Sequence, residues 1–507
     1  MNIAFIPIDN RPVCYTLPEQ VCAINSSINL FMPERKYLGS LTKYADVDKI
    51  FEWLEKIPQV DAIVMCLDTV AYGGLISSRR CPDAFDEIKN RVENLKSILE
   101  KKNAKIYAFS SIMRISNNNV NEEEKEYWDK WGKKIFDYSY QTHKLGTESC
   151  ISNIIPSEIL DDYLATRKRN FEINKLYLEY QKQGLFDTLV FSKDDCAEYG
   201  FNVQEAQALE KLGGFIKTGA DEIPLTLLAR AVVKFFDAKS FTEPVTQSRH
   251  CECERSNSVN SKVVGRNYCL DDETSLKISP IFLAPKYKDL ISNYEDVSIE
   301  KSVKGQLELA GCKVCEPDEA DILLYVNNFE DHQGEIVMKV PTKPFSKKWQ
   351  RPEKPYMIAD VRYANGADNE FVKQLFEVGL GDNFYGYSAW NTSANSLGSL
   401  ICGAVVKYYG FKLQRCQDDN SKTVDRDYYP DNKNENFLKL QTIRFLDDWA
   451  YQANVRQELN SPDEKLVKEK MKPYEKMVFG LLGVDYNISY KFTWNRLFEV
   501  EICILSN

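Results

Sequence analysis

Two adjacent carboxylates, Asp194 and Asp195, are the side chains best placed for acid–base chemistry, because they directly follow a short apolar run. Residues 188–191 predict a buried strand, and the residues from Ser192 onward predict the loop at its carboxyl end. Burial of adjacent carboxylates separates their pKa values, so that one is ionised while the other can donate a proton. A catalytic pair is one interpretation. The other is that both aspartates cap the next helix, expected from about residue 204, or face water.

Polar side chains also follow the other apolar runs of the chain, at the points where strands are expected to end. The carboxyl ends of parallel strands meet at one mouth of a barrel, so these side chains are expected to converge. The set comprises Asp9, Asn10, Arg11, Asp68, Tyr72, Arg114, Asp221, Asn327, Asp360, Asn365, Asp368, Trp390, Asn391 and Asn395. Carboxylates and amides can bridge neighbouring hydroxyl groups, and an aromatic ring can stack on the apolar face of a sugar. We therefore expect these residues to bind a carbohydrate substrate.

The chain has few histidines. They are His143, His250 and His332, and none follows a clear strand. A serine or cysteine nucleophile served by a histidine base is therefore not expected, and neither is a catalytic metal centre built from several histidines. Carboxylates must carry any proton transfer.

The 14 cysteines are spread along the chain, and several, such as Cys66 and Cys402, lie in apolar segments, which is typical of reduced core thiols. Two clusters, at residues 250–253 and 312–315, could together provide zinc ligands. Their spacing is not that of a zinc ribbon. We therefore predict no bound metal ion and no cofactor.

The elements that must position these residues alternate between strands and helices. Nine apolar runs predict strands, at residues 3–8, 62–67, 106–113, 188–191, 214–217, 277–283, 321–327, 356–361 and 384–390. Helical patterns between them predict parallel pairing with right-handed crossovers. The strand count favours a (β/α)8 TIM-like barrel over an open sheet. A closed barrel needs eight strands, so we expect the run at 277–283 to lie in an insertion or to pair outside the barrel.

The character of the chain changes near residue 420. We expect a TIM-like catalytic barrel over residues 1–420, with insertions at about 117–184 and 238–320. Residues 421–507 predict a C-terminal subdomain of long amphipathic helices followed by antiparallel strands.

The charge balance limits the partners of the protein. Sixty-five basic and 75 acidic residues give a net charge of −10, which argues against nucleic acid or an anionic membrane surface as a partner. No run approaches the roughly 20 apolar residues of a membrane span, and the N-terminus passes directly into a strand. We therefore expect a cytoplasmic protein. The sequence does not indicate its oligomeric state.

Six motifs between residue 3 and about residue 400 resemble the signature blocks of an uncharacterised bacterial family, DUF4127: IPIDNRP, LDTVAYGGLISSR, DDCAEYG, GADE, DVRYANGAD and YSAWNTSANSLG. The segment WNRLFE near the C-terminus resembles the closing motif of that family. The resemblance covers nearly the whole chain but implies no established activity.

The barrel motifs also resemble those of the O-GlcNAcase-type β-N-acetylglucosaminidases. This resemblance implies that Asp194 polarises the 2-acetamido group of the substrate, whose oxygen attacks the anomeric carbon, and that Asp195 protonates the leaving oxygen and later activates water. It also implies that Asp368 and Asn391 hold ring hydroxyls, near Tyr387 and Trp390. The sequence has Thr392 where that family usually has proline, and its first-strand motif differs.

Together these observations predict a glycoside hydrolase that uses carboxylate acid–base chemistry, with substrate assistance on a 2-acetamido sugar as the preferred mechanism. Carboxylates on separate strands, such as Asp194 or Asp195 with Asp221 or Asp360, could instead support an ordinary retaining or inverting mechanism. Two alternatives stay open. One is a metal-dependent barrel enzyme on a small acid or phosphate, with ligands from Asp9, Asp68, Asp194 and Asp360. The other is a non-catalytic carbohydrate-binding protein.

Overall fold

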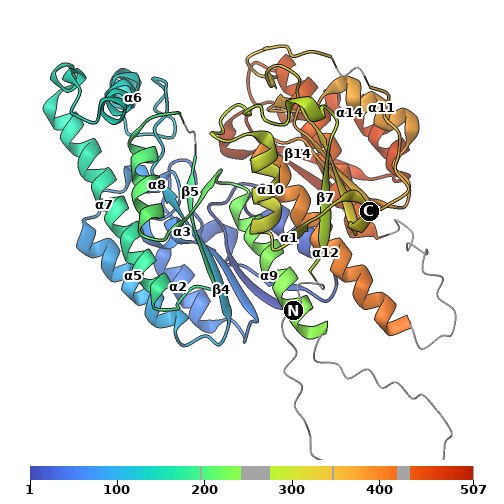
Figure 1. Cartoon of the computed structure of the whole chain (residues 1–507), viewed down its shortest axis with the longest axis horizontal. Coiled ribbons are helices and arrows are strands. Elements are labelled where there is room, and N and C mark those ends of the chain that lie inside the picture. Colours follow the sequence, from blue (N-terminus) through green and yellow to red (C-terminus); the bar gives the residue numbers. More distant parts are fainter. Residues whose placement is uncertain (195–196, 241–274, 345–346, 419–433, 506–507) are drawn as a thin grey trace, which may run out of the picture.

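The computed structural model of the chain describes residues 1–194, 197–240, 275–344, 347–418 and 434–505. Most of its strands lie in two separate parallel sheets that stand side by side (Figure 1). The first sheet contains β1 (Asn2–Ile6), β2 (Asn29–Phe31), β3 (Ala62–Cys66), β4 (Lys105–Ile112), β5 (Thr188–Lys193) and β6 (Phe215–Thr218). The second contains β7 (Lys277–Phe282), β8 (Lys313–Val314), β9 (Ile322–Asn327), β11 (Tyr356–Asp360) and β13 (Phe384–Ser388). Each sheet with its helices is called a lobe below.

Both sheets have the same strand order. The first sheet is ordered β2-β1-β3-β4-β5-β6, and the second, from its β8 edge, is ordered β8-β7-β9-β11-β13. Each therefore follows the 2-1-3-4-5 order of doubly wound, flavodoxin-like sheets. In such sheets, ligands bind outside the carboxyl ends of the strands where the strand order reverses. That point lies between β1 and β3 in the first lobe and between β7 and β9 in the second.

The predicted parallel α/β architecture is confirmed, whereas the predicted (β/α)8 barrel is wrong. Within the described residues, β2 and β6 are the edges of the first sheet and β8 and β13 are the edges of the second, so neither sheet closes. The strand predicted at 277–283, which was expected outside the barrel, is β7 and pairs with β8 and β9 inside the second sheet. Alternating strands and helices are common to a barrel and to two successive open sheets, so this pattern cannot separate them.

Helices cover both faces of each sheet. The first lobe contains α1 (Thr16–Cys22), α2 (Val47–Lys56), α3 (Leu67–Tyr72), α4 (Ser77–Arg80), α5 (Phe85–Leu99), α6 (Trp128–Leu145), α7 (Ser157–Lys182), α8 (Phe201–Lys211) and α9 (Ile223–Ser240). The second contains α10 (Ile299–Leu309), α11 (Asn369–Val378) and α12 (Ser393–Asp418). Helices α6 and α7 form an arm at the left of Figure 1. No helix in the described part of the chain is both long enough and apolar enough to cross a membrane.

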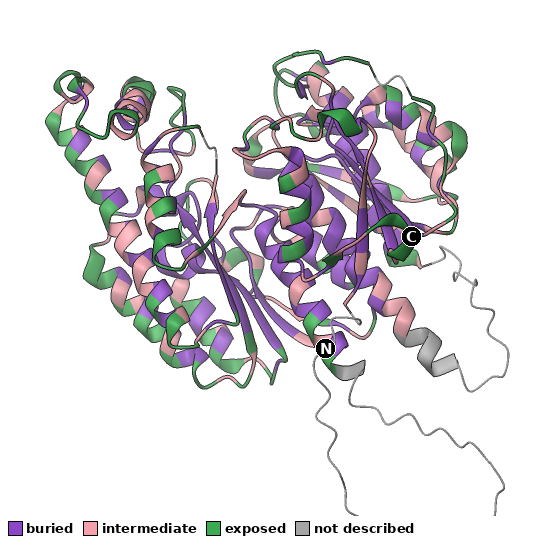
Figure 2. Ribbon diagram, in the orientation of Figure 1, coloured by how far each residue is buried: buried purple, intermediate pink, exposed green. Residues whose placement is uncertain are grey.

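The two lobes are joined by a layer of helices between the sheets. Helix α9 packs on β3 and β4 and also on α12, which packs on β11 and β13. Because α9 contacts neighbours on several sides, it carries apolar residues almost all round, among them Leu225, Leu228 and Val232, and all three are fully buried. One continuous apolar core extends from Phe5 in the first sheet through α9 to Leu324 in the second, and Figure 2 shows this interior as buried. The shared core fixes the carboxyl ends of the two sheets relative to each other.

The last part of the chain packs onto the second lobe. Helix α13 (Glu435–Arg444) continues into a π-helical segment, η5 (Phe445–Asn454), and both contact β13. Helix α14 (Glu464–Leu482) precedes β14 (Asn487–Phe492) and β15 (Val500–Leu505), which pair antiparallel as predicted. A short parallel pair, β10 (Gly334–Glu335) and β12 (Tyr363–Ala364), lies outside the main sheets. The predicted domain boundary near residue 420 stays a prediction, because it falls on residues 419–433, outside the described part.

Candidate active site

A cavity of about 460 Å³ lies between the two lobes, at the carboxyl ends of their strands. Its wall is formed by the loops that follow β1, β3, β4, β5 and β6 in the first lobe and β7, β11 and β13 in the second, together with C-terminal residues. The charged and amide side chains at this wall are Arg11, Arg114, Glu122, Glu123, Asp194, Asp221, Glu295, Asn365, Asn391, Asn395, Arg456 and Arg496. This is where the topology of both sheets directs a ligand.

Six of the 14 residues predicted to bind substrate lie at the cavity. Those at its wall are Arg11, Arg114, Asp221, Asn365, Asn391 and Asn395, and Asp194 of the predicted catalytic pair also lies there. The described residues that do not line it are Asp9, Asn10, Asp68, Tyr72, Asn327, Asp360, Asp368 and Trp390. Asp195 lies outside the described residues. The structure thus gathers the strand tips into one place, as expected, but only part of the predicted set reaches the cavity.

Arg11, at the turn after β1, is the centre of a buried charge cluster. Its Nη1 and Nη2 atoms lie 3.0 and 2.5 Å from the two carboxylate oxygens of Asp221, and its Nε donates to Asp9 at 2.8 Å. Glu499, from the C-terminal segment, lies 3.5 Å from Nη1. Neither oxygen of Glu499 accepts a hydrogen bond, and burial raises the pKa of Glu499 to about 8. The cluster ties the tips of β1 and β6 to the C-terminal segment.

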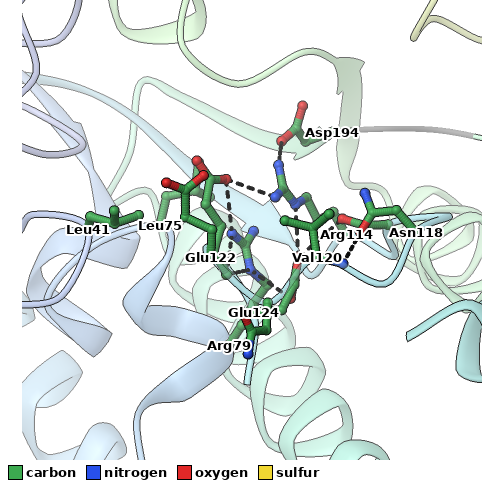
Figure 3. Close-up of polar contacts among 12 residues, drawn as sticks. Leu41, Leu75, Arg79, Arg114, Asn118, Val120, Glu122, Glu124 and Asp194 are labelled. Carbon is green, nitrogen blue, oxygen red and sulfur yellow. Dashed lines mark hydrogen bonds and ion pairs between the residues drawn. The ribbon is translucent and has the colours of Figure 1, made fainter. Parts of the chain in front are cut away.

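Arg114, after β4, is the centre of a second cluster at the cavity wall (Figure 3). Its Nη2 lies 2.8 Å from Glu123, its Nε lies 3.1 Å from Glu124, and its Nη1 lies 3.4 Å from Asp194. Glu123 also pairs with Arg496 at 2.8 Å. Burial alone would raise the pKa of Glu123, but the charges of Arg114, Arg79 and Arg496 hold it well below its usual range. The cluster therefore keeps ionised carboxylates at the cavity, and Asp194 faces a permanent positive charge.

Glu295 brings a carboxyl group of different character to the same cavity. It lies in the loop between β7 and α10, where its Oε1 accepts the backbone N–H of Ala394 at 2.7 Å and its Oε2 accepts the hydroxyl of Ser302 at 2.7 Å. Burial raises the pKa of Glu295 above its usual value. A carboxyl group with a raised pKa can hold the proton that an acid catalyst must deliver.

Contacts of the neighbouring residue hold this loop against the first lobe. Asp296 pairs with Lys193 at the end of β5 and accepts the hydroxyl of Thr218 at the end of β6. Lys193 directly precedes Asp194 in the chain. The carboxyl groups of Asp194 and Glu295 therefore come from opposite lobes but belong to adjoining loops.

A third carboxyl group, Glu222, lies behind the loop that ends β6. The backbone N–H of Ala220 donates to it at 3.1 Å, and Gln306 donates at 3.3 Å. The pKa of Glu222 is raised to about 8. Burial is the main cause, and the nearby charges of Asp221, Glu295 and Asp194 contribute to the same rise. Gly219 leaves the space that this side chain needs, since a Cβ atom there would lie only 1.7 Å from Glu222 Oε1. Burial thus favours the protonated form of Glu222, which supports the cavity wall.

The strand tips of the second lobe form a buried network of their own. Asp360, at the end of β11, accepts hydrogen bonds from Asn327 at 2.8 Å, from Tyr387 at 3.0 Å and from the backbone N–H of Asp368 at 2.9 Å. Burial, with the charge of Asp368, raises the pKa of Asp360 to about 7. Arg362 lies 3.3 Å from Asp368. These predicted substrate-binding residues therefore have structural partners instead of facing the cavity.

Four other predicted residues lie beside the cavity, two of them hydrogen-bonded to protein groups and two of them buried aromatic side chains. Asn10 accepts the indole N–H of Trp494 at 2.8 Å, and Asp68 accepts the hydroxyl and backbone N–H of Ser111. Tyr72 and Trp390 are buried. All four residues were predicted to bind a ligand because they follow predicted strands. In the structure they pack beside the cavity and do not line it.

Backbone strain is concentrated at the cavity. Tyr294, Asn365 and Asn391 line it and have positive φ angles of 67°, 60° and 58°. Non-glycine residues with such angles are uncommon and cost roughly 1–3 kcal/mol each, so they persist where the surroundings hold them and are frequent at functional sites. The backbone N–H of Asn365 donates to the carbonyl of Asn391 at 2.7 Å, which joins two of the three strained residues. The strain supports the assignment of this cavity as the functional site.

The carboxylates considered as metal ligands are not brought together. Asp9 pairs with Arg11, Asp194 with Arg114, Asp68 with Ser111, and Asp360 with Asn327. Within the described residues, no group of three or more histidine, cysteine, aspartate or glutamate side chains is arranged to hold a metal ion. The cysteine cluster at 250–253 lies outside these residues, so the shared zinc site is untested.

Several charged residues of the site lie at positions that the strand pattern does not predict. Glu295 lies in a loop with no strong local pattern, and Glu123 and Arg456 lie far from any predicted strand tip. Arg496 was the only one with a signal, because it belongs to the WNRLFE segment near the C-terminus. These residues reach the cavity through long-range packing, which local periodicity does not encode.

Comparison with known families gives one match. The family described as "Protein of unknown function (DUF4127)" matches residues 3–503. No curated protein matches the chain. The comparisons therefore do not show the resemblance to O-GlcNAcase-type enzymes, and the barrel that it implied is absent from the described strands.

Proposed function

The chain belongs to the DUF4127 family, and we propose that it is a glycoside hydrolase whose active site is the cavity between the lobes. The proposal rests on two unlike carboxyl groups, on adjoining loops, at the wall of one cavity. Glu295 is buried with a raised pKa, whereas Asp194 is partly exposed and faces Arg114. Two carboxyl groups whose environments favour opposite protonation states are the usual equipment for cleaving a glycosidic bond.

In the proposed reaction, Glu295 donates its proton to the glycosidic oxygen as the bond from that oxygen to the anomeric carbon breaks. Asp194 accepts a proton from the water molecule whose oxygen bonds to the anomeric carbon, and the proton later returns to Glu295 through solvent. The products are two free sugar hydroxyl groups. The guanidinium of Arg114 lies 3.4 Å from Asp194 and places a positive charge beside the proposed base. The role predicted for Asp195, and with it assistance by a 2-acetamido group, stays a prediction.

The remaining wall suits a polyhydroxylated substrate. Asn365, Asn391 and Asn395 present amides, which can donate to and accept from hydroxyl groups. Asn395 is 8% exposed, and its Oδ1 has no hydrogen-bond partner, so a hydroxyl donor would satisfy it. Phe498 and Tyr294 supply aromatic surface at the same wall.

The test is a hydrolysis screen of the purified protein against aryl glycosides of neutral, 2-acetamido and acidic sugars. We expect Asp194→Asn and Glu295→Gln each to lower kcat by about 10²-fold or more, the range of acid–base catalysis. The matched controls Asp161→Asn and Glu308→Gln change exposed carboxylates on α7 and α10. They should stay within twofold of the unchanged protein.

Near-normal turnover by both cavity variants would refute the assignment. Loss of activity on chelation would instead favour the metal-dependent alternative. Sugar binding without hydrolysis of any glycoside would favour the non-catalytic alternative.

A further inference from the structure

Four arginines line the cavity, and three of them are neutralised by the protein. Arg11 pairs with Asp221 and Asp9, Arg114 pairs with Glu123 and Glu124, and Arg496 pairs with Glu123. Arg456 is the fourth. Within the described residues, no carboxylate oxygen lies within 4 Å of its guanidinium, the distance that defines an ion pair.

Arg456 is nevertheless held in a fixed position. It lies in the short 3₁₀ helix Val455–Glu458 that follows the π-helical segment η5, and its Nη1 donates to Gln452 Oε1 at 2.8 Å. Its guanidinium also packs over the ring of Phe498, with the central carbon 5.4 Å from the ring centroid. A side chain fixed on both sides loses little conformational freedom when it binds a ligand.

The surroundings of Arg456 favour an anion. Burial lowers the pKa of Arg456, and the opposing charges named with it, those of Tyr451, Glu335 and Asp447, come from groups that form no ion pair with its guanidinium. A desolvated cation without a counterion is costly, and an anion bound beside it removes part of that cost. The guanidinium of Arg496 also packs over the ring of Phe498, with its central carbon 5.2 Å from the ring centroid, so both arginines lie beside the same aromatic ring at the cavity wall.

We propose that Arg456 binds a carboxylate or phosphate group of the ligand, so that the protein acts on acidic sugars in preference to neutral ones. The sugar part of this inference rests on the proposed glycoside hydrolysis, whereas the anion site does not. Arg–carboxylate and Arg–phosphate contacts use the same planar fork of N–H donors, so both chemistries are compatible with the site.

The test measures binding by isothermal titration calorimetry at constant ionic strength, in a zwitterionic buffer free of phosphate. The probes are D-glucuronate, D-glucose 6-phosphate and D-glucose. We expect at least one acidic probe to bind at least tenfold more tightly than D-glucose. The acidic probe that binds distinguishes a carboxylate from a phosphate.

Two variants at position 456 distinguish the effect of the positive charge from that of the planar guanidinium shape. Arg456→Gln should weaken binding of the acidic probe at least tenfold and leave D-glucose binding unchanged, whereas Arg456→Lys should retain part of the preference. The control Arg91→Gln removes an arginine that pairs with Asp83 away from the cavity, and it should bind like the unchanged protein. Thermal melting confirms that each variant is folded.

Equal binding of acidic and neutral probes, unchanged binding of the acidic probe by Arg456→Gln, or no binding of either acidic probe would overturn the inference. Binding of an acidic sugar through Arg456 without hydrolysis of any aryl glycoside would have a different meaning. It would refute the proposed hydrolase and leave the anion site standing.

Discussion

In the first lobe, polar residues that follow β1, β4, β5 and β6 reach the cavity, whereas in the second lobe those that end β9 and β11 are buried in a network of their own. Arg11, Arg114 and Asp194 line the cavity, but Asn327 and Asp360 bond to other protein groups. Both sets lie at the carboxyl ends of parallel strands, and Arg114 after β4 and Asp360 at the end of β11 occupy equivalent positions in the two strand orders. A polar residue at a strand tip can therefore contact a ligand or stabilise the fold, and its neighbours decide which.

The neighbours differ in charge. In the first lobe, arginines pair with the carboxylates and hold the pKa of Glu123 well below its usual range. In the second lobe, Asp360 is bonded mainly by neutral groups, Asn327 and Tyr387, and burial raises its pKa to about 7. The arginines around Glu123 thus keep that carboxylate ionised, whereas burial among neutral groups favours the protonated form of Asp360.

The largest effect on stability is expected at Arg11, where the first lobe depends on one guanidinium. Arg11→Gln leaves Asp9 and Asp221 buried without their counterion, and breaking a buried ion pair in this way costs about 3–5 kcal/mol. The free energy of unfolding, measured in urea at pH 7, should fall by that amount.

Arg35→Gln is the matched control, because Arg35 pairs with Glu501 but its side chain is 33% exposed. A more exposed pair of this kind contributes at most about 1 kcal/mol. If Arg11→Gln is no less stable than Arg35→Gln, the buried charge cluster around Arg11 does not stabilise the first lobe.

The raised pKa of Asp360 in the second lobe should make the folded protein less stable as pH rises toward 7. The pKa of Asp360 is 3.8 in the unfolded chain and about 7 in the folded protein, so the folded state binds the proton more tightly. Asp360 makes its full contribution to the free energy of unfolding below pH 4. This contribution is lost as pH rises toward 7, by up to about 1.4 kcal/mol for each pH unit. Asp360→Asn, which mimics the protonated acid, should make the free energy of unfolding less dependent on pH between 5 and 8.

Glu123 provides a comparison for this prediction. Its pKa is lowered in the folded protein, whereas that of Asp360 is raised, so the two groups change the stability in opposite directions as pH rises. The stabilising contribution of Glu123 is present above pH 4.5 and is lost as pH falls further. Glu123→Gln should therefore leave the pH 5–8 slope unchanged. An unchanged slope in Asp360→Asn would show that Asp360 does not take up its proton in this range.

The sequence alone predicts the elements better than their arrangement. Continuous apolar runs such as residues 62–66 mark strands that are buried on both faces, and these strands are present where expected. The break between β6 and β7 is not visible in such runs, because a strand shows no sign of the sheet to which it belongs. The site is predictable only in part for the same reason. Arg11 and Asp194 follow strands, whereas Glu295 and Arg456 reach the cavity through loop packing and the shared core of the lobes.

The smallest expected effect is at Asn391, where the second lobe does reach the cavity. Its φ of 58° lies in the left-handed region, which glycine adopts without cost and which costs other residues roughly 1–2 kcal/mol. Asn391→Gly should therefore leave the free energy of unfolding within about 0.5 kcal/mol of its original value, while Asn391→Ala should lower it by about 1 kcal/mol. Both variants keep the carbonyl that accepts the N–H of Asn365, and both lose the amide, so any loss of sugar affinity should be equal in the two. Equal stability of the glycine and alanine variants would show that this loop is free to relax, and the strained backbone would then no longer mark the cavity as a preorganised site.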